Sequence, residues 1–273
     1  IYNNDGAFQR MISSNFGCKK VMLLDGVLSG NEHSLNVADL KTKLLKFVYR
    51  IFPENKNFYL PSILGISNPD RILVITKHCR AYLQKNSIDV NKISVIGFSR
   101  LNIENQTVPN KADLRISRVI FVAQSFLWHG LQKFNYAMLL EIKFWKKVCL
   151  EMGLDFAVKP HPRNSKSDFN DLKEEIVFTS ESDNIDPCTL YIGMSSTYIL
   201  ERHKLGYGIL ITRSSNFFKT VDNMFYSSEF PIVENEAQAT YFLNNLHLCV
   251  INRFEKDYTF GSDILYEEFK SLL

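Results

Sequence analysis

The sequence predicts an α/β protein with parallel sheets, and three observations carry this prediction. Short runs rich in β-branched and aromatic residues alternate with amphipathic helical stretches along most of the chain, which is the pattern of strands joined by crossover helices. One polar segment without periodicity, residues 102–117, interrupts this alternation. The length of 273 residues suits about two domains of roughly 150 residues each.

The first half contains three expected strands and two expected helices. Residues 20–24 (KVMLL) form an apolar run that is typical of a buried strand. Residues 39–52 place their apolar side chains on one helical face before Pro53, which cannot continue a helix. The strands are expected at residues 20–24, 71–75 and 93–96, and the helices at residues 39–52 and 77–86.

The alternation restarts after the polar segment. In an open parallel sheet, ligands bind beyond the carboxyl ends of the strands, so residues that directly follow strands are the candidates for a site. The strands of the second half are expected at residues 118–123, 156–159, 189–192 and 208–212, and the helices at residues 134–152 and 197–204.

The same division defines the predicted domains. We expect an N-terminal domain over residues 1–101, a linker over residues 102–117 and a C-terminal domain over residues 118–273. Because the chain begins at Ile1, without Met or a signal peptide, we expect a piece of a longer protein whose N-terminal domain is incomplete. Two α/β halves joined by a polar connector also predict a ligand-binding cleft.

Composition and charge exclude several classes of protein. With 45% hydrophobic and 22% charged residues, the chain is neither a disordered segment nor a small disulfide-stapled fold. The 32 Lys and Arg against 29 Asp and Glu leave a net charge of +3, an excess too small to indicate nucleic-acid binding. The five cysteines are scattered and lack C-x-x-C spacing, so the sequence predicts neither a zinc site nor a disulfide framework, and a reducing cytoplasm fits best.

Together with the cysteines, the short apolar runs predict a cytoplasmic protein that is soluble or peripheral to a membrane. Runs such as residues 119–123 are far shorter than the roughly 20 residues that span a bilayer. The basic stretch at residues 41–50 (KTKLLKFVYR) leaves two alternatives open. It is either a helix packed on the sheet with solvated lysines, or a peripheral contact with the inner face of the membrane.

The most informative motif is Lys159-Pro160-His161-Pro162-Arg163, at the end of an expected strand. Two prolines stiffen the backbone around the histidine and keep the turn out of a helix. Arg163 can bind two phosphate oxygens, Lys159 adds a point charge, and His161 can donate a hydrogen bond or a proton. The motif predicts a phosphate site, and an ordinary turn with a solvated lysine and arginine is the alternative.

A second motif follows another expected strand. Gly193 is expected to let the backbone turn sharply, and Ser195, Ser196 and Thr197 stand where the next helix begins. Hydroxyl and backbone N–H groups at a helix N-terminus can converge on an anion, with the helix dipole behind them. The alternative is that Ser195 or Ser196 caps the helix.

A third motif is Asp25-Gly26, again at a strand end. A carboxylate with room beside it suits a general base, and a plain Asp-Gly turn is the alternative. The sequence contains no D-x-D pair, no H-E-x-x-H, no P-loop and no G-x-S-x-G, which argues against a metal-dependent nucleotide-sugar site, a zincin, a P-loop enzyme and an α/β-hydrolase.

Taken in order, these segments resemble the bacterial sialyltransferases and polysialyltransferases of lipooligosaccharide and capsule synthesis. The resemblance runs from about residue 20 to about residue 245. It implies a GT-B architecture of two Rossmann-like domains with parallel sheets. The segments that carry it are Asp25-Gly26 after its strand, Val95-Ile-Gly-Phe-Ser-Arg100, Lys159-Pro-His-Pro-Arg163 and Gly193-Met-Ser-Ser-Thr-Tyr-Ile-Leu-Glu201.

The resemblance also implies roles for individual residues. Asp25 would be the general base that deprotonates the acceptor hydroxyl. His161 would contact the donor phosphate as a ligand or an acid, and Ser195 and Ser196 would hold the same phosphate. The family motif has two acids where this sequence has Leu24 and Asp25, so either one carboxylate suffices or Asp25 is not the base.

The predicted function is that of a metal-independent, inverting glycosyltransferase. It would move sialic acid or a related sugar from a CMP-activated donor to a hydroxyl of a glycan or lipid-linked oligosaccharide, in bacterial surface-polysaccharide synthesis, without a cofactor. Three alternatives stay open. Teichoic-acid glycerophosphotransferases, which use CDP-glycerol, carry a similar Lys-x-His-Pro turn followed by a Ser-Ser turn. The other two are a nucleotide-sugar epimerase and a non-catalytic protein that binds a nucleotide or a glycan.

Overall fold

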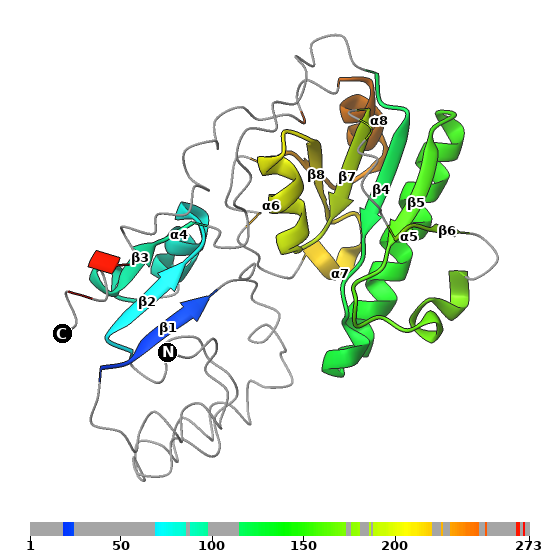
Figure 1. Ribbon diagram of the computed structural model, residues 1–273. Helices are drawn as coiled ribbons and strands as arrows, with labels where there is room; N and C mark the ends of the chain where they lie inside the picture. The colour runs from blue at the N-terminus through cyan, green and yellow to red at the C-terminus, as the bar shows by residue number, and fades with distance from the viewer. Residues whose placement is uncertain are drawn as a thin grey trace. The chain divides into compact units, whose positions relative to one another are not determined.

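The computed structural model describes residues 19–24, 69–85, 88–97, 115–172, 176–180, 188–219 and 230–245, together with residues 186, 225, 249, 266, 267 and 270 (Figure 1). The chain divides into two compact units, one of Ile1–Asn102, Asp222–Ser227 and Lys256–Leu273, the other of Ile103–Val221 and Ser228–Glu255. This division groups the last 18 residues with the first unit, whereas the sequence-based limits place them in the second. The sequence-based limits stay a prediction.

The described part of the first unit contains a parallel sheet of three strands, β1 (Val21–Leu24), β2 (Arg71–Val74) and β3 (Ile93–Val95), in the order β1-β2-β3. Helix α4 (Lys77–Lys85) follows β2 and packs on this sheet. It begins after Thr76, whose buried hydroxyl accepts the backbone N–H of Cys79 at 3.1 Å. These strands and this helix confirm the elements that the sequence predicts at residues 20–24, 71–75, 93–96 and 77–86. The helix predicted at residues 39–52 lies outside the described residues.

The second unit is built on a six-stranded parallel sheet in the order β6-β5-β4-β7-β8-β9 (Figure 1). The chain starts in the middle, builds outward to β6, returns to the other side of β4 and builds outward again. This is the strand order 3-2-1-4-5-6 of a Rossmann sheet. All strands are parallel, and the side to which the chain adds new strands changes between β4 and β7. The strands are β4 (Arg118–Val122), β5 (Asp155–Lys159), β6 (Val177–Phe178), β7 (Thr189–Gly193), β8 (Gly208–Thr212) and β9 (Ile232–Val233).

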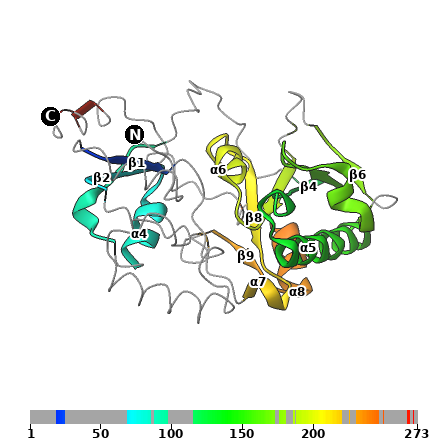
Figure 2. The same cartoon turned by 90° about the horizontal axis from the view of Figure 1, so that it is seen from below.

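Helices cover both faces of this sheet. Figure 2 shows α6 (Thr197–Lys204) on one side, and α5 (Gln132–Glu151), α7 (Asn216–Lys219) and α8 (Glu236–Asn244) on the other. Because both faces are covered, β7 and β8 are buried at every position, which explains their continuous apolar sequences.

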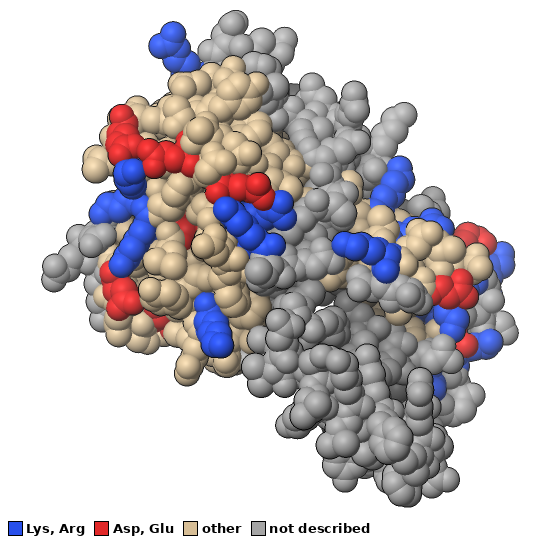
Figure 3. All heavy atoms as spheres, turned by 180° about the vertical axis from the view of Figure 1, so that it is seen from behind, with Lys and Arg blue, Asp and Glu red and all other residues tan. Residues whose placement is uncertain are grey.

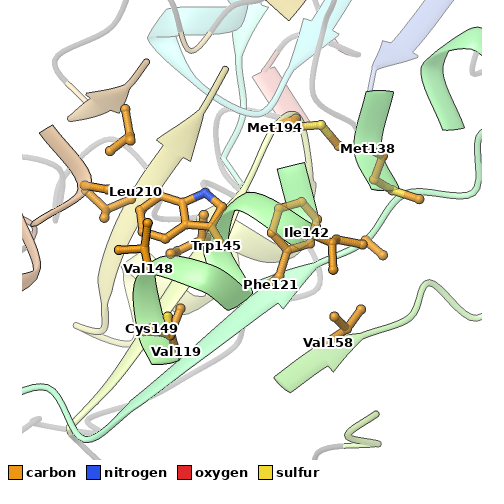
Figure 4. Close-up of a cluster of buried hydrophobic side chains, with 14 of the residues drawn as sticks. Val119, Phe121, Met138, Ile142, Trp145, Val148, Cys149, Val158, Met194 and Leu210 are labelled. Carbon is orange, nitrogen blue, oxygen red and sulfur yellow. The ribbon is translucent and has the colours of Figure 1, made fainter. Parts of the chain in front are cut away.

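The main core lies between the sheet and α5. Trp145 of α5 is fully buried among Phe121 of β4, Leu210 of β8 and the apolar stripe of its own helix (Figure 4). Its indole Nε1 donates a hydrogen bond to Thr212 Oγ1 at 2.9 Å, so the polar edge of the ring is satisfied inside the core. Loss of a buried tryptophan of this kind costs about 3–5 kcal/mol, so the packing of α5 contributes substantially to the stability of the unit.

The sequence predicts the long elements of this unit and misses the short ones. The strands at residues 118–123, 156–159, 189–192 and 208–212 and the helices at residues 134–152 and 197–204 are confirmed, with ends that shift by one or two residues. β6 and β9 have two residues each, too few for a period to be visible. The short helix α7 and the longer helix α8, both after β8, were not predicted.

The described surface carries charges of both signs. Figure 3 shows lysines and arginines interspersed with aspartates and glutamates over the described part of one face. One such group lies on α5 and α8, where Lys147 contacts Glu236 at 2.8 Å and Glu151 at 3.6 Å. Among the described residues, none of the helices combines the length and the apolar character that a membrane crossing needs.

Candidate functional site

The candidate site lies at the carboxyl edge of the six-stranded sheet, where β4, β5 and β7 end. Gln124, two residues after β4, joins the three loops. Its side-chain Nε2 donates to the backbone carbonyl oxygen of Ser195, after β7, at 3.0 Å. The backbone carbonyl oxygen of Gln124 accepts from the side-chain Nδ2 of Asn164, after β5, at 3.2 Å. The chain adds strands toward one side of the sheet up to β6 and toward the other side from β7 onward, so the switch point lies between β4 and β7. Open α/β sheets bind ligands at such a switch point.

The segment after β5 forms a tight turn around His161. The backbone N–H of Asn164 donates to the carbonyl oxygen of His161 at 2.8 Å, and Pro162 occupies the second position of this turn, where its fixed φ is favoured. The backbone N–H of His161 donates in return to Asn164 Oδ1, also at 2.8 Å. Pro160 precedes the turn and is half-buried. Both backbone groups of His161 are therefore held by one residue, Asn164.

The imidazole of His161 is oriented by its own turn. Its Nδ1 accepts the backbone N–H of Arg163 at 3.1 Å. A ring nitrogen that accepts a hydrogen bond carries no proton, so this network assigns the proton of the neutral ring to Nε2. His161 can thus offer Nε2–H as a hydrogen-bond donor.

Asp168 holds Asn164 in place. Its buried carboxylate accepts from Asn164 Nδ2 at 2.9 Å and from the Ser165 hydroxyl. The backbone carbonyl oxygen of Asp168 accepts from the side-chain amide of Asn135 of α5 at 3.2 Å. Burial acts to raise the pKa of Asp168, but the hydrogen bonds from Ser165 and Asn164 outweigh it and hold this pKa below its ordinary value. The anion that results fixes Asn164, and through it His161.

The segment after β7 supplies backbone and a helix start. Ser196 caps α6, since its hydroxyl accepts the backbone N–H of Tyr198 at 3.3 Å, so the capping alternative describes this serine. Ser195 is half-buried beside it, and Thr197 is the first residue of the helix. Of the three hydroxyl residues predicted to contact a phosphate after β7, Ser196 is the one whose hydroxyl caps the helix.

Gly193 has a different role from the predicted one. It is the last residue of β7 and does not have the positive φ that the expected sharp turn would need. A Cβ at this position would collide with Cδ1 of Ile199 and lie 3.3 Å from the carbonyl oxygen of Val122. Glycine therefore allows α6 to approach the end of β4 and β7 closely.

The two cations of the motif contact different elements. Lys159 Nζ lies 4.7 Å from the centroid of the Tyr198 ring, in the first turn of α6. The Arg163 guanidinium lies 5.9 Å from the ring of Trp128, an indole that is 66% exposed on the short helix η4 (Leu127–His129) after β4. Lys159 therefore contacts the helix that follows β7, and Arg163 contacts the short helix that follows β4.

The structure brings most of the predicted residues to one edge and adds three that the sequence did not single out. Asp25 and Gly26 lie outside the described residues. Gln124, Asn164 and Asp168 were missed, because amides and carboxylates in loops carry no motif. Gln124 and Asn164 lie in the loops that follow β4 and β5, which is the one signal that marks them; Asp168 lies farther along the chain, on the short helix η5 (Lys166–Leu172). In the part of the chain that the structure describes, no group of three or more His, Cys, Asp and Glu side chains could hold a metal ion.

Several solved structures are similar in fold. MnaA of S. aureus, in a structure with UDP, is 12% identical, and the match covers 98% of this chain and 79% of MnaA with a TM-score of 0.50. The UDP-GlcNAc 2-epimerase of Methanocaldococcus jannaschii is 15% identical over 93% of this chain and 75% of its own, with a TM-score of 0.46. The spinosyn forosaminyltransferase SpnP is 10% identical over 96% and 72%, with a TM-score of 0.47. No protein-family model and no curated protein sequence matches the chain.

At this level of identity, the likeness to MnaA shows the fold. The chain has the GT-B fold, an α/β architecture with parallel sheets, as the sequence predicts.

Proposed function

We propose that this protein is a glycosyltransferase that transfers sialic acid or a related sugar from a CMP-activated donor to a hydroxyl of a glycan or lipid-linked oligosaccharide. The observation that carries the proposal is the junction at the switch point, where Gln124 links the ends of β4 and β7 and the His161 turn joins them from β5. These contacts fix the loops that carry His161, Arg163 and the start of α6 at one edge, and groups of this kind suit the phosphate of a nucleotide.

The proposed reaction creates negative charge at this junction. The acceptor oxygen attacks the anomeric carbon of the sugar, the bond from that carbon to the phosphate oxygen breaks, and CMP leaves with the electron pair. His161 Nε2–H donates to the phosphate, and Arg163, whose guanidinium lies over the Trp128 ring, adds positive charge. Groups fixed in advance stabilise such developing charge without reorganising during the step.

The remaining roles are those that the family resemblance implies, together with the capping of α6 by Ser196. The acceptor proton passes to Asp25. Ser195 and the backbone N–H groups at the start of α6 contact the phosphate, while Ser196 fixes that first turn through its hydrogen bond to Tyr198. Asn164 and Asp168 act as positioning residues, because they hold the His161 turn and have no direct part in the step.

The test combines binding and turnover on the full chain. We expect CMP to raise the melting temperature more than UMP, CDP or UDP, since a ligand of the native state stabilises it; UDP is included because MnaA binds it. His161→Ala and Asn164→Ala should both lose this shift. Asn170→Ala, at an exposed position on helix η5 (Lys166–Leu172), is the matched control and should keep it.

Turnover then decides among the alternatives. CMP-linked sialic acid should be hydrolysed or transferred to a glycan, and His161→Ala should reduce this turnover. CDP-glycerol turnover with an inert CMP-sugar would assign the chain to the glycerophosphotransferases, and epimerised product without an acceptor would assign it to the epimerases. Nucleotide binding without turnover of any donor would favour the binding protein.

A further inference from the structure

A hollow of about 720 Å³ lies at the same edge of the sheet, beyond the end of β8. Its volume falls within the roughly 300–1,000 Å³ of small-molecule sites. One wall is the first three turns of α5, where Lys133, Tyr136 and Leu140 share a helical face. The opposite wall is formed by Ser214 and Ser215, in the loop after β8, and by the first two residues of α7, Asn216 and Phe217. Tyr136 and Leu140 are 62% and 41% exposed, so this wall offers apolar surface to a ligand.

A buried carboxylate fixes the loop that forms the second wall. Glu141 of α5 has no exposed surface, and it accepts from the Ser214 hydroxyl at 2.8 Å, from the Ser215 backbone N–H at 2.6 Å and from the Thr212 hydroxyl. A buried charge is tolerated where hydrogen bonds satisfy it. The loop is therefore attached to α5 before any ligand arrives, and the hollow is preformed.

The chemistry of the lining suits a sugar with a negative charge. Tyr136 and Phe217 offer aromatic surface on which the apolar face of a sugar ring can pack. Gln132, Ser214 and Asn216 offer amide and hydroxyl groups that can bond sugar hydroxyls, and Lys133 offers a cation for a carboxylate. A neutral nucleobase would leave the lysine without a counter-charge.

One wall of the hollow and the phosphate junction follow strands that end at the same edge of the sheet. β8 is the second strand from β4, so the ends of these two strands lie about 10 Å apart, given about 4.8 Å between neighbouring strands. A nucleotide sugar with its phosphate at the junction would bridge this spacing to place its sugar in the hollow.

We propose that this hollow binds the transferred sugar of the donor and selects one that carries a carboxylate. This inference rests on the proposed function and deepens it, since it assigns the sugar to the β8 loop and α5 and the phosphate to the β4, β5 and β7 loops. Lys133 is then the residue that distinguishes an acidic sugar from a neutral one.

The experiment compares CMP with CMP-linked sialic acid by isothermal titration calorimetry on the full chain. We expect Lys133→Ala to weaken binding of the nucleotide sugar about tenfold, the loss of one charged hydrogen bond, and to leave CMP binding unchanged. Tyr136→Ala should act in the same direction. The matched controls are Lys143→Ala, at an exposed position farther along α5, and Tyr241→Ala, at an exposed position on α8, and both should bind like the wild type.

The outcomes separate the inference from the proposed function. If Lys133→Ala and Tyr136→Ala weaken CMP as much as the nucleotide sugar, the hollow holds the nucleotide and the inference is wrong while the function stands. If neither variant changes the affinity for the nucleotide sugar, the inference is wrong as well. If the wild-type chain binds neither CMP nor its sugar conjugate, the proposed function fails first, and the loss is already visible without any variant.

Discussion

Glu141 is a fully buried polar side chain on which the stability of the second unit should depend, and its truncation tests the packing of α5 against the end of β8 and the loop that follows. In Glu141→Ala, the hydroxyl of the fully buried Thr212 and the backbone N–H of Ser215 lose their acceptor. The Ser214 hydroxyl is half-buried and can turn to water.

The magnitude follows from the two donors that stay unsatisfied. Each costs about 1–3 kcal/mol, and the cavity left by the side chain adds to this, while the relief of a buried carboxylate offsets part of it. We expect Glu141→Ala to lower the free energy of unfolding by about 3 kcal/mol. Glu141→Gln keeps the shape and one carbonyl acceptor, and should lose about 1–2 kcal/mol.

The assay is urea denaturation followed by tryptophan fluorescence. The two tryptophans of the chain, Trp128 and Trp145, both belong to the second unit, so the signal reports its unfolding. Glu151→Ala is the matched control, because Glu151 is an exposed glutamate on the same helix and its loss should leave stability close to that of the wild type. If Glu141→Ala is as stable as Glu151→Ala, the reasoning about buried donors is refuted.

Two further predictions concern titratable groups. Because the pKa of Asp168 is lowered in the folded protein, its stabilisation is present above the unfolded value of about 3.9 and is lost as pH falls through the folded value. The difference in unfolding free energy between wild type and Asp168→Asn should therefore shrink from pH 6 to about pH 3 in urea titrations, and a constant difference would contradict this. Burial raises the pKa of Cys79 to about 11 and those of Cys149 and Cys249 to about 12, whereas Cys188 is half-buried. Cys188 should react with iodoacetamide before these three, as read by mass spectrometry of peptides, and equal labelling would show that the core opens.

The sequence located the site on the chain but not its working parts. The prolines around His161 predict a rigid turn, and the structure contains one, because proline restricts its own φ and the residue before it. Arg163 and Lys159 are close in sequence, yet one contacts Trp128 and the other Tyr198. Which way a side chain points after a strand depends on neighbours from other elements, and spacing does not encode this.

Glu141 shows a second limit. It lies on the apolar face of α5, between Met138 and Trp145, where the helical period predicts another apolar side chain. A carboxylate there signals a polar partner in the core, but its partners are the last residue of β8 and the loop that follows, 71 to 74 residues further along the chain. The sequence therefore shows that Glu141 breaks the apolar pattern, but only the structure shows which groups bond it.

What the sequence by itself determined is the local order: which segments are strands, which are helices, and that polar turns follow buried strands. These properties depend on periods of about 2 and 3.6 residues, which are visible within one segment. The tertiary structure alone decided that the turns meet, because parallel strands put their carboxyl ends at one edge and the strand order is set by how the layers pack. Gln124 bonds Ser195 across 71 residues and is bonded by Asn164 across 40, and only the folded sheet makes those residues neighbours.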